Sequence, residues 1–131
     1  MNRTSTLAQE LGKRLRDIVK YNEKLAQHTS LKIGGEADYF ITPRCLEDLE
    51  ASLALAKEFD LPWIVMGNGT NILFPDEGYR GMVIKLGPKM GAKSLRDDIL
   101  VAQAGASLGG LIKYLHEHDL NDFDFLVSIP A

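Results

Sequence analysis

The stretch that decides the fold is residues 63–71, Trp-Ile-Val-Met-Gly-Asn-Gly-Thr-Asn, in which an apolar run leads directly into a glycine loop. The apolar run at 63–66 is typical of a β-strand that is buried on both faces. The two glycines of 67–71 permit positive φ and a close approach of the backbone to a ligand. Successive N–H groups of such a loop can form an anion-binding nest, to which Thr70 and Asn71 would add side-chain donors. The pattern fits a diphosphate-binding loop and a plain tight turn equally well.

This loop differs from the two most familiar phosphate-binding loops. A dinucleotide fingerprint would have a third glycine where Ile72 stands and a helix after it, whereas β-rich residues follow here. A P-loop requires Gly-Lys followed by Ser or Thr, and the sequence does not contain this tripeptide. No Ser-His-Asp pattern or metal-binding helix motif is recognisable either, so the sequence predicts no catalytic residue.

Hydrophobic periodicity along the chain predicts an α+β fold. Leu7, Leu11 and Leu15 recur at helical spacing within residues 1–24, which we expect to form a helical arm that is either docked on the domain or mobile. The main domain is expected to occupy residues 25–131. Its expected strands lie at 31–33, 39–41, 63–66, 82–84 and 99–104, and its expected helices lie at 46–56 and 108–115, with Ser107 capping the last helix.

Composition narrows the class of protein. A chain of 131 residues is long enough for one domain, and its net charge of −3 argues against binding to a nucleic-acid backbone. No apolar run approaches the roughly 18 residues of a membrane span. Polar and charged residues interrupt the N-terminus, which therefore lacks the apolar core of a signal peptide. These features predict a cytoplasmic protein that binds neither nucleic acid nor membranes.

The few cysteine and histidine residues do not predict a metal site. Cys45 is the only cysteine, and beside Leu46 we expect it to be a small core residue. His116 and His118 fall near the end of the last predicted helix, where cations are favoured. Residues two apart on a helix do not share a face, so these histidines are expected to cap the helix rather than bind a metal.

The C-terminal residues predict an incomplete domain. Phe125 to Ile129 are mostly apolar and Pro130 ends no recognisable element, whereas natural termini are usually polar. We expect the chain to be a fragment or the product of an early-terminated gene. The loss of a packing partner would expose apolar surface near Phe123, Phe125 and Leu126, which favours self-association.

Four blocks in order resemble the bacterial UDP-N-acetylenolpyruvoylglucosamine reductases. Residues 28–39, HTSLKIGGEADY, are similar to the family's NTSLKIGGPADY, with His28 in place of the asparagine. Residues 65–81 resemble LGxGSNLLVxDxGFRG, and residues 102–107 resemble VxAGAG. Residues 125–130 resemble the start of LEFLxGIPGTVGGA. Four matches over residues 28–131 form a specific pattern.

The resemblance implies a fold, a cofactor and an activity. The family binds FAD in a two-part α+β domain of the vanillyl-alcohol-oxidase type. It passes a hydride from NADPH through FAD to the enolpyruvyl group of a UDP-sugar, which yields UDP-N-acetylmuramate for peptidoglycan. Residues 25–131 would then be the first FAD-binding subdomain, incomplete at its C-terminus.

Site residues follow from the same resemblance. Gly67, Asn68, Gly69, Thr70 and Asn71 would hold the FAD pyrophosphate through backbone N–H groups, with Thr70 and Asn71 assisting. Ile129 would begin a second flavin-contacting loop. The family's catalytic residues have no counterparts in these 131 residues, so we expect the chain alone to be inactive.

Two other functions remain open. The chain could be the FAD subunit of another oxidase or dehydrogenase of the same fold, since the matching blocks lie on the cofactor side. It could also be a non-catalytic module that binds a nucleotide or another protein. Binding of flavin separates the two enzymatic functions from the non-catalytic one.

Overall fold

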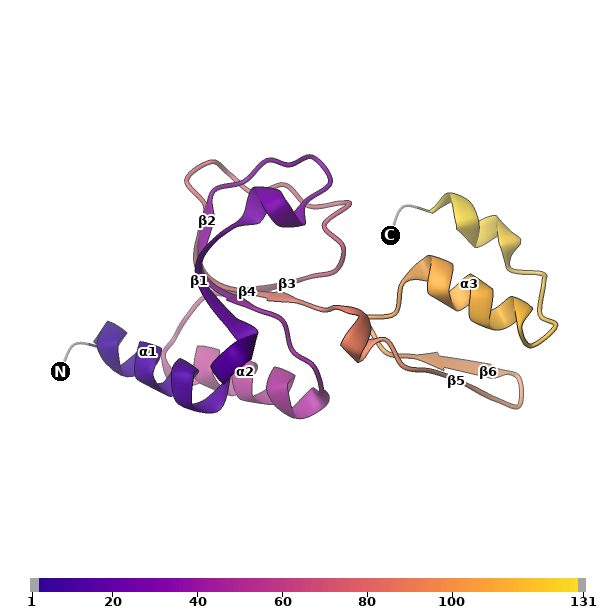
Figure 1. Ribbon diagram of the computed structural model, residues 1–131, viewed down its shortest axis with the longest axis horizontal. Coiled ribbons are helices and arrows are strands. Elements are labelled where there is room, and N and C mark those ends of the chain that lie inside the picture. The colour runs from indigo at the N-terminus through magenta and orange to yellow at the C-terminus, as the bar shows by residue number, and fades with distance from the viewer. Residues whose placement is uncertain (1–2, 130–131) are drawn as a thin grey trace.

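The computed structural model describes residues 3–129 as two lobes that lie end to end (Figure 1). The N-terminal lobe, residues 3–86, contains a sheet and two helices, and the C-terminal lobe, residues 87–129, contains a hairpin and one helix. The helices are α1 (Arg3–Arg14), α2 (Leu46–Glu58) and α3 (Leu108–His116), and the strands are β1 (Val19–Lys24), β2 (Glu36–Ile41), β3 (Trp63–Met66), β4 (Tyr79–Lys85), β5 (Lys93–Arg96) and β6 (Ile99–Ala102).

The sheet of the N-terminal lobe has the order β1-β2-β4-β3. Strands β2, β4 and β3 run parallel, and β1 pairs antiparallel with β2. Val83 of β4 lies opposite Phe40 on one side and Ile64 on the other, which makes β4 a central strand. Helix α2 supplies the crossover from β2 to β3 that parallel strands require.

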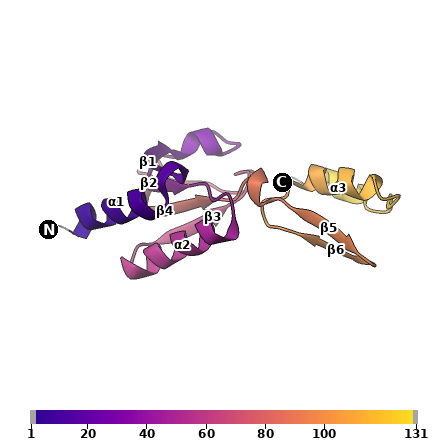
Figure 2. The ribbon, with the colours of Figure 1, turned by 60° about the horizontal axis from the view of Figure 1, so that its bottom comes forward.

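Each face of this sheet is covered by a different layer. Helices α1 and α2 cover one face, and the loops after β1 and β3 cover the other (Figures 1 and 2). Side chains alternate along β4, because successive residues of a strand point to opposite faces. Met82 and Ile84 therefore pack with the helices, whereas Val83 packs with Phe40 and Phe74 beneath the loops.

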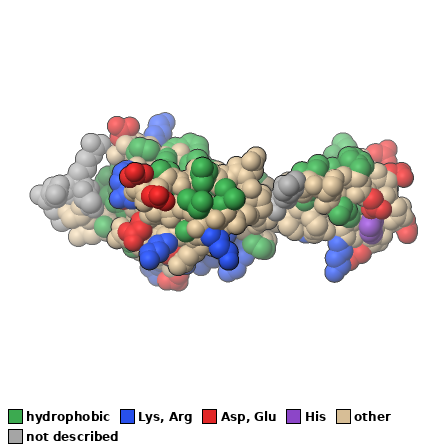
Figure 3. All heavy atoms as spheres, turned by 90° about the horizontal axis from the view of Figure 1, so that it is seen from above, with side chains coloured by type: hydrophobic (Ala, Val, Ile, Leu, Met, Phe, Trp, Pro, Cys, Tyr) green, Lys and Arg blue, Asp and Glu red, His purple; other side chains and the backbone are tan. Residues whose placement is uncertain are grey.

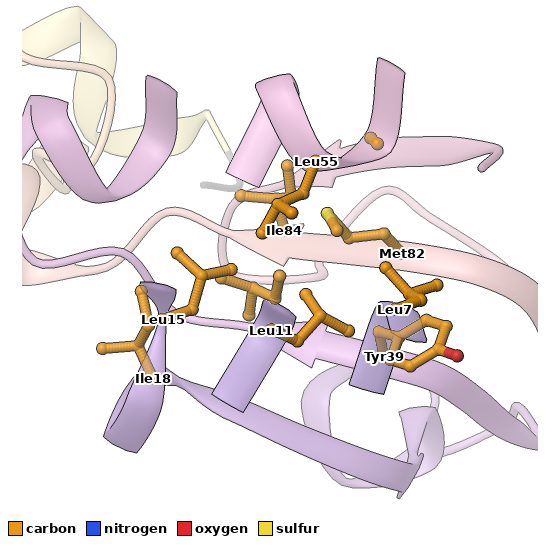
Figure 4. Packing of buried hydrophobic residues seen from close by; sticks show 10 residues of the cluster. Leu7, Leu11, Leu15, Ile18, Tyr39, Leu55, Met82 and Ile84 are labelled. Atoms are coloured by element: carbon orange, nitrogen blue, oxygen red, sulfur yellow. The ribbon is translucent and has the colours of Figure 1, made fainter. Parts of the chain in front are cut away.

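Helix α1 is an integral part of the core. Leu7, Leu11 and Leu15 are at most 5% exposed and pack toward Met82 and Ile84 (Figure 4). Burial of a leucine side chain contributes roughly 1.5–3 kcal/mol. The first of the two possibilities for the arm, a helix docked on the domain, is therefore the one observed.

Other differences from the sequence predictions have local causes. Val19–Lys24, assigned to the helical arm, forms edge strand β1, whose side chains are mostly exposed and so lack an apolar signal. Residues 31–33, where a strand was expected, form no strand.

Strand β3 was expected to be buried on both faces, but it is half exposed. Trp63 is 50% and Val65 is 39% accessible, because β3 lies at the edge of the sheet rather than inside it. Cys45 is exposed, since it precedes the first turn of α2 instead of packing in the core.

The C-terminal lobe has a small core. Strands β5 and β6 form an antiparallel hairpin in which Leu95 lies opposite Leu100. Ser107 caps α3 as predicted, since its Oγ accepts a hydrogen bond of 3.1 Å from the N–H of Gly110. Few side chains are buried here, and many apolar ones remain at the surface (Figure 3). The buried apolar residues of this lobe, within the described range, are Met90, Ile112 and Leu115.

His116, the last residue of α3, and His118, two residues beyond it, contact polar groups at the C-terminal end of this helix. His118 Nδ1 lies 2.8 Å from the carbonyl oxygen of Tyr114, an acceptor in the last turn of the helix. His116 Nε2 lies 2.5 Å from Asp124, which follows the helix.

Among the described residues, no helix has the length and apolar character that crossing a membrane requires.

Replacing a buried leucine of α1 tests its place in the core. Leu11→Ala is expected to lower the free energy of unfolding by about 2–5 kcal/mol, because it leaves a cavity at a fully buried site. Leu46→Ala, at an exposed position of α2, is the matched control and should cost less than about 0.5 kcal/mol. Urea unfolding measures both. Equal effects of the two substitutions would show that α1 is not packed on the sheet in solution.

Candidate functional site

The loop 67–71 lies at the carboxyl end of β3, beside the end of β4. The N–H of Leu86 donates a hydrogen bond of 2.9 Å to the carbonyl oxygen of Met66, so the two chain segments stay together as they leave the sheet. In open α/β sheets, ligands bind in crevices outside the carboxyl ends of parallel strands. The position of the loop therefore suits a binding site.

A cleft of about 360 Å³ lies between the two lobes at this loop. One wall is formed by residues 65–72 of the N-terminal lobe. The opposite wall is formed by Ala104, Ala106 and Ser107, which precede α3. The structure thus brings the predicted residues Gly67, Asn68, Gly69, Thr70 and Asn71 together in one cleft.

Ile129 lies in a neighbouring hollow instead. This second cavity, of about 660 Å³, is formed between α3 and the residues that follow it, and its apolar lining includes Leu108, Ile112 and Val127. Ser107 lines both cavities. Pro130, the final residue of the last block of the resemblance, lies outside the described residues.

The backbone of loop 67–71 presents several hydrogen-bond donors. Within residues 3–129, none of its N–H groups donates to a protein acceptor, and the side chains of Asn68, Thr70 and Asn71 are exposed. Ser107 lines the opposite wall as the N-cap of α3, and a helix N-terminus favours negative charge. No Lys, Arg, Asp or Glu lines the cleft, so an anion bound there would interact with amide dipoles.

Gly69 fixes the position of this loop. It has a φ of +72°, a conformation that L side chains rarely adopt, and a Cβ at this position would come within 2.0 Å of the carbonyl oxygen of His28. The carbonyl oxygen of Gly69 accepts a hydrogen bond of 2.9 Å from the N–H of Ser30. Residues 28–30 therefore support the loop from behind.

The glycine at position 35 allows two loops to approach each other closely. A Cβ on Gly35 would lie 2.1 Å from the carbonyl oxygen of Asp76. The N–H of Gly35 donates to the carbonyl oxygen of Pro75 at 2.9 Å. Gly35 thus allows the loop after β1 to contact the loop before β4, and both loops cover the same face of the sheet.

Sequence reasoning did not identify the polar pair behind the loop. Nε2 of His28 lies 2.8 Å from Oε1 of Glu23, and the His28 ring stacks on Phe40 with centroids 4.2 Å apart. The hydrogen bond from His28 lowers the pKa of Glu23 below its ordinary value, with Lys20 contributing and burial opposing. The only sequence signal was that His28 stands where the family motif has asparagine.

Comparison with known proteins decides the family. The sequence profile of a family described as an FAD binding domain matches residues 37–130. The chain belongs to this FAD-binding family. FAD, predicted from the resemblance, is the cofactor of the family.

Two similar proteins share one name. The UDP-N-acetylenolpyruvoylglucosamine reductase of Clostridioides difficile (strain 630) is 38% identical over 88% of this chain and 38% of its own length. The protein of the same name from Geobacter sulfurreducens is 37% identical over 95% of this chain and 42% of its own length. The predicted resemblance to the reductases is confirmed, and the chain spans about two fifths of the length of these curated relatives.

Solved structures confirm the predicted α+β fold of the vanillyl-alcohol-oxidase type. An alkyldihydroxyacetonephosphate synthase superposes with a TM-score of 0.66 at 25% identity, over 87% of this chain and 25% of that protein. A p-cresol methylhydroxylase superposes with a TM-score of 0.64 at 18% identity, over 90% of this chain and 25% of that one. The second likeness concerns the fold alone.

Two glycines of the loop provide a matched pair of substitutions. Gly69→Ala is expected to lower the free energy of unfolding by about 1–3 kcal/mol, because it adds strain at positive φ and a contact with His28. Gly67→Ala should cost less than about 0.5 kcal/mol, since a Cβ there meets no atom within 4 Å. Thermal unfolding of both variants measures the difference. A Gly69→Ala protein as stable as Gly67→Ala would contradict the described contact.

Proposed function

We propose that this chain is the FAD-binding portion of a reductase of the UDP-N-acetylenolpyruvoylglucosamine type. The observation that carries this proposal is the set of backbone N–H groups in loop 67–71 that have no acceptor among the described residues. They line the same cleft as the N-cap of α3. Such a donor set fits a diphosphate, which carries negative charge and accepts several hydrogen bonds.

Individual residues would then have separate tasks. Gly67, Asn68 and Gly69 would bind the FAD pyrophosphate through backbone N–H groups. Thr70 and Asn71 would add a hydroxyl and an amide as donors. Ile129, in the adjacent apolar hollow, would contact an uncharged part of the cofactor. Residues 25–131 would form the cofactor subdomain, while residues 1–24 complete the core behind it through α1.

The proposed activity belongs to a longer protein than this chain. Bound FAD supplies hydride transfer, here between NADPH and the enolpyruvyl group of a UDP-sugar. Reduction of such a double bond also needs a positioned proton donor, and no acidic side chain lines the cleft. The chain therefore contributes binding and orientation of the cofactor, and we propose that it does not catalyse the reaction alone. The proposed reaction would take place in the cytoplasm.

Sequence similarity favours this reductase over other flavoproteins of the same fold. The reductases are 37–38% identical to the chain, whereas the alkyldihydroxyacetonephosphate synthase is 25% identical. The four sequence blocks include loop 67–71 and the opposite wall of the cleft.

Titration with FAD tests the proposal directly. The visible spectrum and the flavin fluorescence of the purified chain should change saturably, because the pyrophosphate is held by the free N–H groups. Gly69→Ala should weaken binding by about tenfold, since the loop would shift, whereas Gly12→Ala, on helix α1 away from the cleft, should bind as the wild type does. Bound chain should show no NADPH oxidation that depends on the enolpyruvyl UDP-sugar. Absence of saturable binding would refute the cofactor site, and substrate-dependent turnover would refute the proposal that the chain does not catalyse the reaction alone.

We also propose that the chain self-associates through the C-terminal lobe. Phe125 is 69% and Val127 is 68% exposed, and such apolar surface favours association. Light scattering at high concentration should detect oligomers, and Phe125→Asp should reduce them. Leu31→Asp is the matched control, at an exposed apolar position of the other lobe. A clean monomer at high concentration would contradict this interface.

A further inference from the structure

His28 is held on two sides by side chains from the sheet. Its ring stacks on Phe40 of β2 with an angle of 24° between the planes, and its Nε2 lies 2.8 Å from Oε1 of Glu23 on β1. The side chains of His28 and Glu23 are 16% and 18% exposed. Both side chains are therefore partly shielded from water.

The backbone of His28 contacts loop 67–71. Gly69 packs so closely on the carbonyl oxygen of His28 that a Cβ would come within 2.0 Å of it. Two residues further on, the N–H of Ser30 bonds the carbonyl oxygen of Gly69 at 2.9 Å. Thr29 between them is 6% exposed and its hydroxyl donates to the carbonyl oxygen of Ile33 at 3.1 Å. A shift of the His28 ring would therefore move the backbone on which Gly69 rests.

We propose that His28 is a positioning residue for loop 67–71, held in place by its hydrogen bond to Glu23 and its stacking on Phe40. The ring acts through its own backbone and touches no ligand of the cleft. The identity of that ligand as FAD rests on the proposed function, whereas the mechanical link between His28 and Gly69 does not.

Two charged side chains lie near the ring. Glu23 and Lys20 are 3.0 Å apart on β1, whereas Phe40 of β2 is uncharged and loop 67–71 has no ionisable side chain. Because the hydrogen bond from His28 lowers the pKa of Glu23, the contribution of this carboxylate to stability is present above its ordinary pKa and is lost as the pH falls through the lowered value. The bond between Glu23 and His28 therefore helps to hold the ring in place.

Three substitutions separate positioning from simple packing. His28→Ala removes both the ring stacking and the bond to Glu23, and FAD affinity should fall by about tenfold. His28→Gln places an amide N–H near the position of Nε2, so it should restore most of the affinity. Glu23→Gln replaces the carboxylate with a weaker acceptor and should lower the affinity by less than His28→Ala does. His118→Gln, beyond the C-terminal end of α3, is the matched control and should keep the wild-type affinity.

The test measures FAD dissociation constants of the full chain at one pH, together with hydrogen-exchange protection of the Ser30 amide. We expect weaker FAD binding and lower protection in His28→Ala than in the wild type, and recovery of most of both in His28→Gln. Equal binding and equal protection in the wild type and His28→Ala would overturn the proposal.

The protection factor also separates this proposal from the proposed function. If no variant binds FAD but His28→Ala lowers Ser30 protection at constant pH, the positioning role stands and the cofactor assignment fails. If FAD binds equally well to the wild type, His28→Ala and His28→Gln, the cofactor assignment stands and the positioning role fails.

Discussion

The N-terminal lobe depends on the burial of β4 between two neighbouring strands and two covering layers. Met82, Val83 and Ile84 are fully buried, the outer two against the helices and the middle one against the loops. Their backbone pairs with β2 on one side and β3 on the other. A single strand therefore joins both hydrophobic clusters, and its carboxyl end directs the chain to the cleft and into the C-terminal lobe.

The cleft results from this arrangement and from two close backbone approaches. Parallel strands β3 and β4 end together, which places loop 67–71 opposite the residues that precede α3. The contact of Gly69 with His28 and the contact of Gly35 with Asp76 fix the loops that cover the second face of the sheet. Neither contact leaves room for a side chain, so both positions require glycine.

Features that depend on neighbouring residues in the sequence could be predicted. Features that depend on contacts between residues far apart in the sequence could not. The α+β class, the strand at 82–84 and the Ser107 cap follow from local patterns, as does the glycine loop itself. Strand β1 was missed because an edge strand with mostly exposed side chains carries no apolar alternation. The other wall of the cleft consists of Ala104, Ala106 and Ser107, whose small side chains give no signal of a binding surface. The bond between His28 and Glu23 depends on how the segment after β1 folds back on the sheet.

The two-lobe shape has a thermodynamic consequence. The chain passes from one lobe to the other once, after β4, and few apolar residues of the C-terminal lobe are buried (Figure 1). Two bodies joined in this way open as separate cooperative units, with the C-terminal lobe at the low end of the range of local stabilities. A ligand that contacts both walls of the cleft stabilises only the state in which both lobes are folded. Such a ligand would merge two unfolding transitions into one, because it couples the folding of the two lobes.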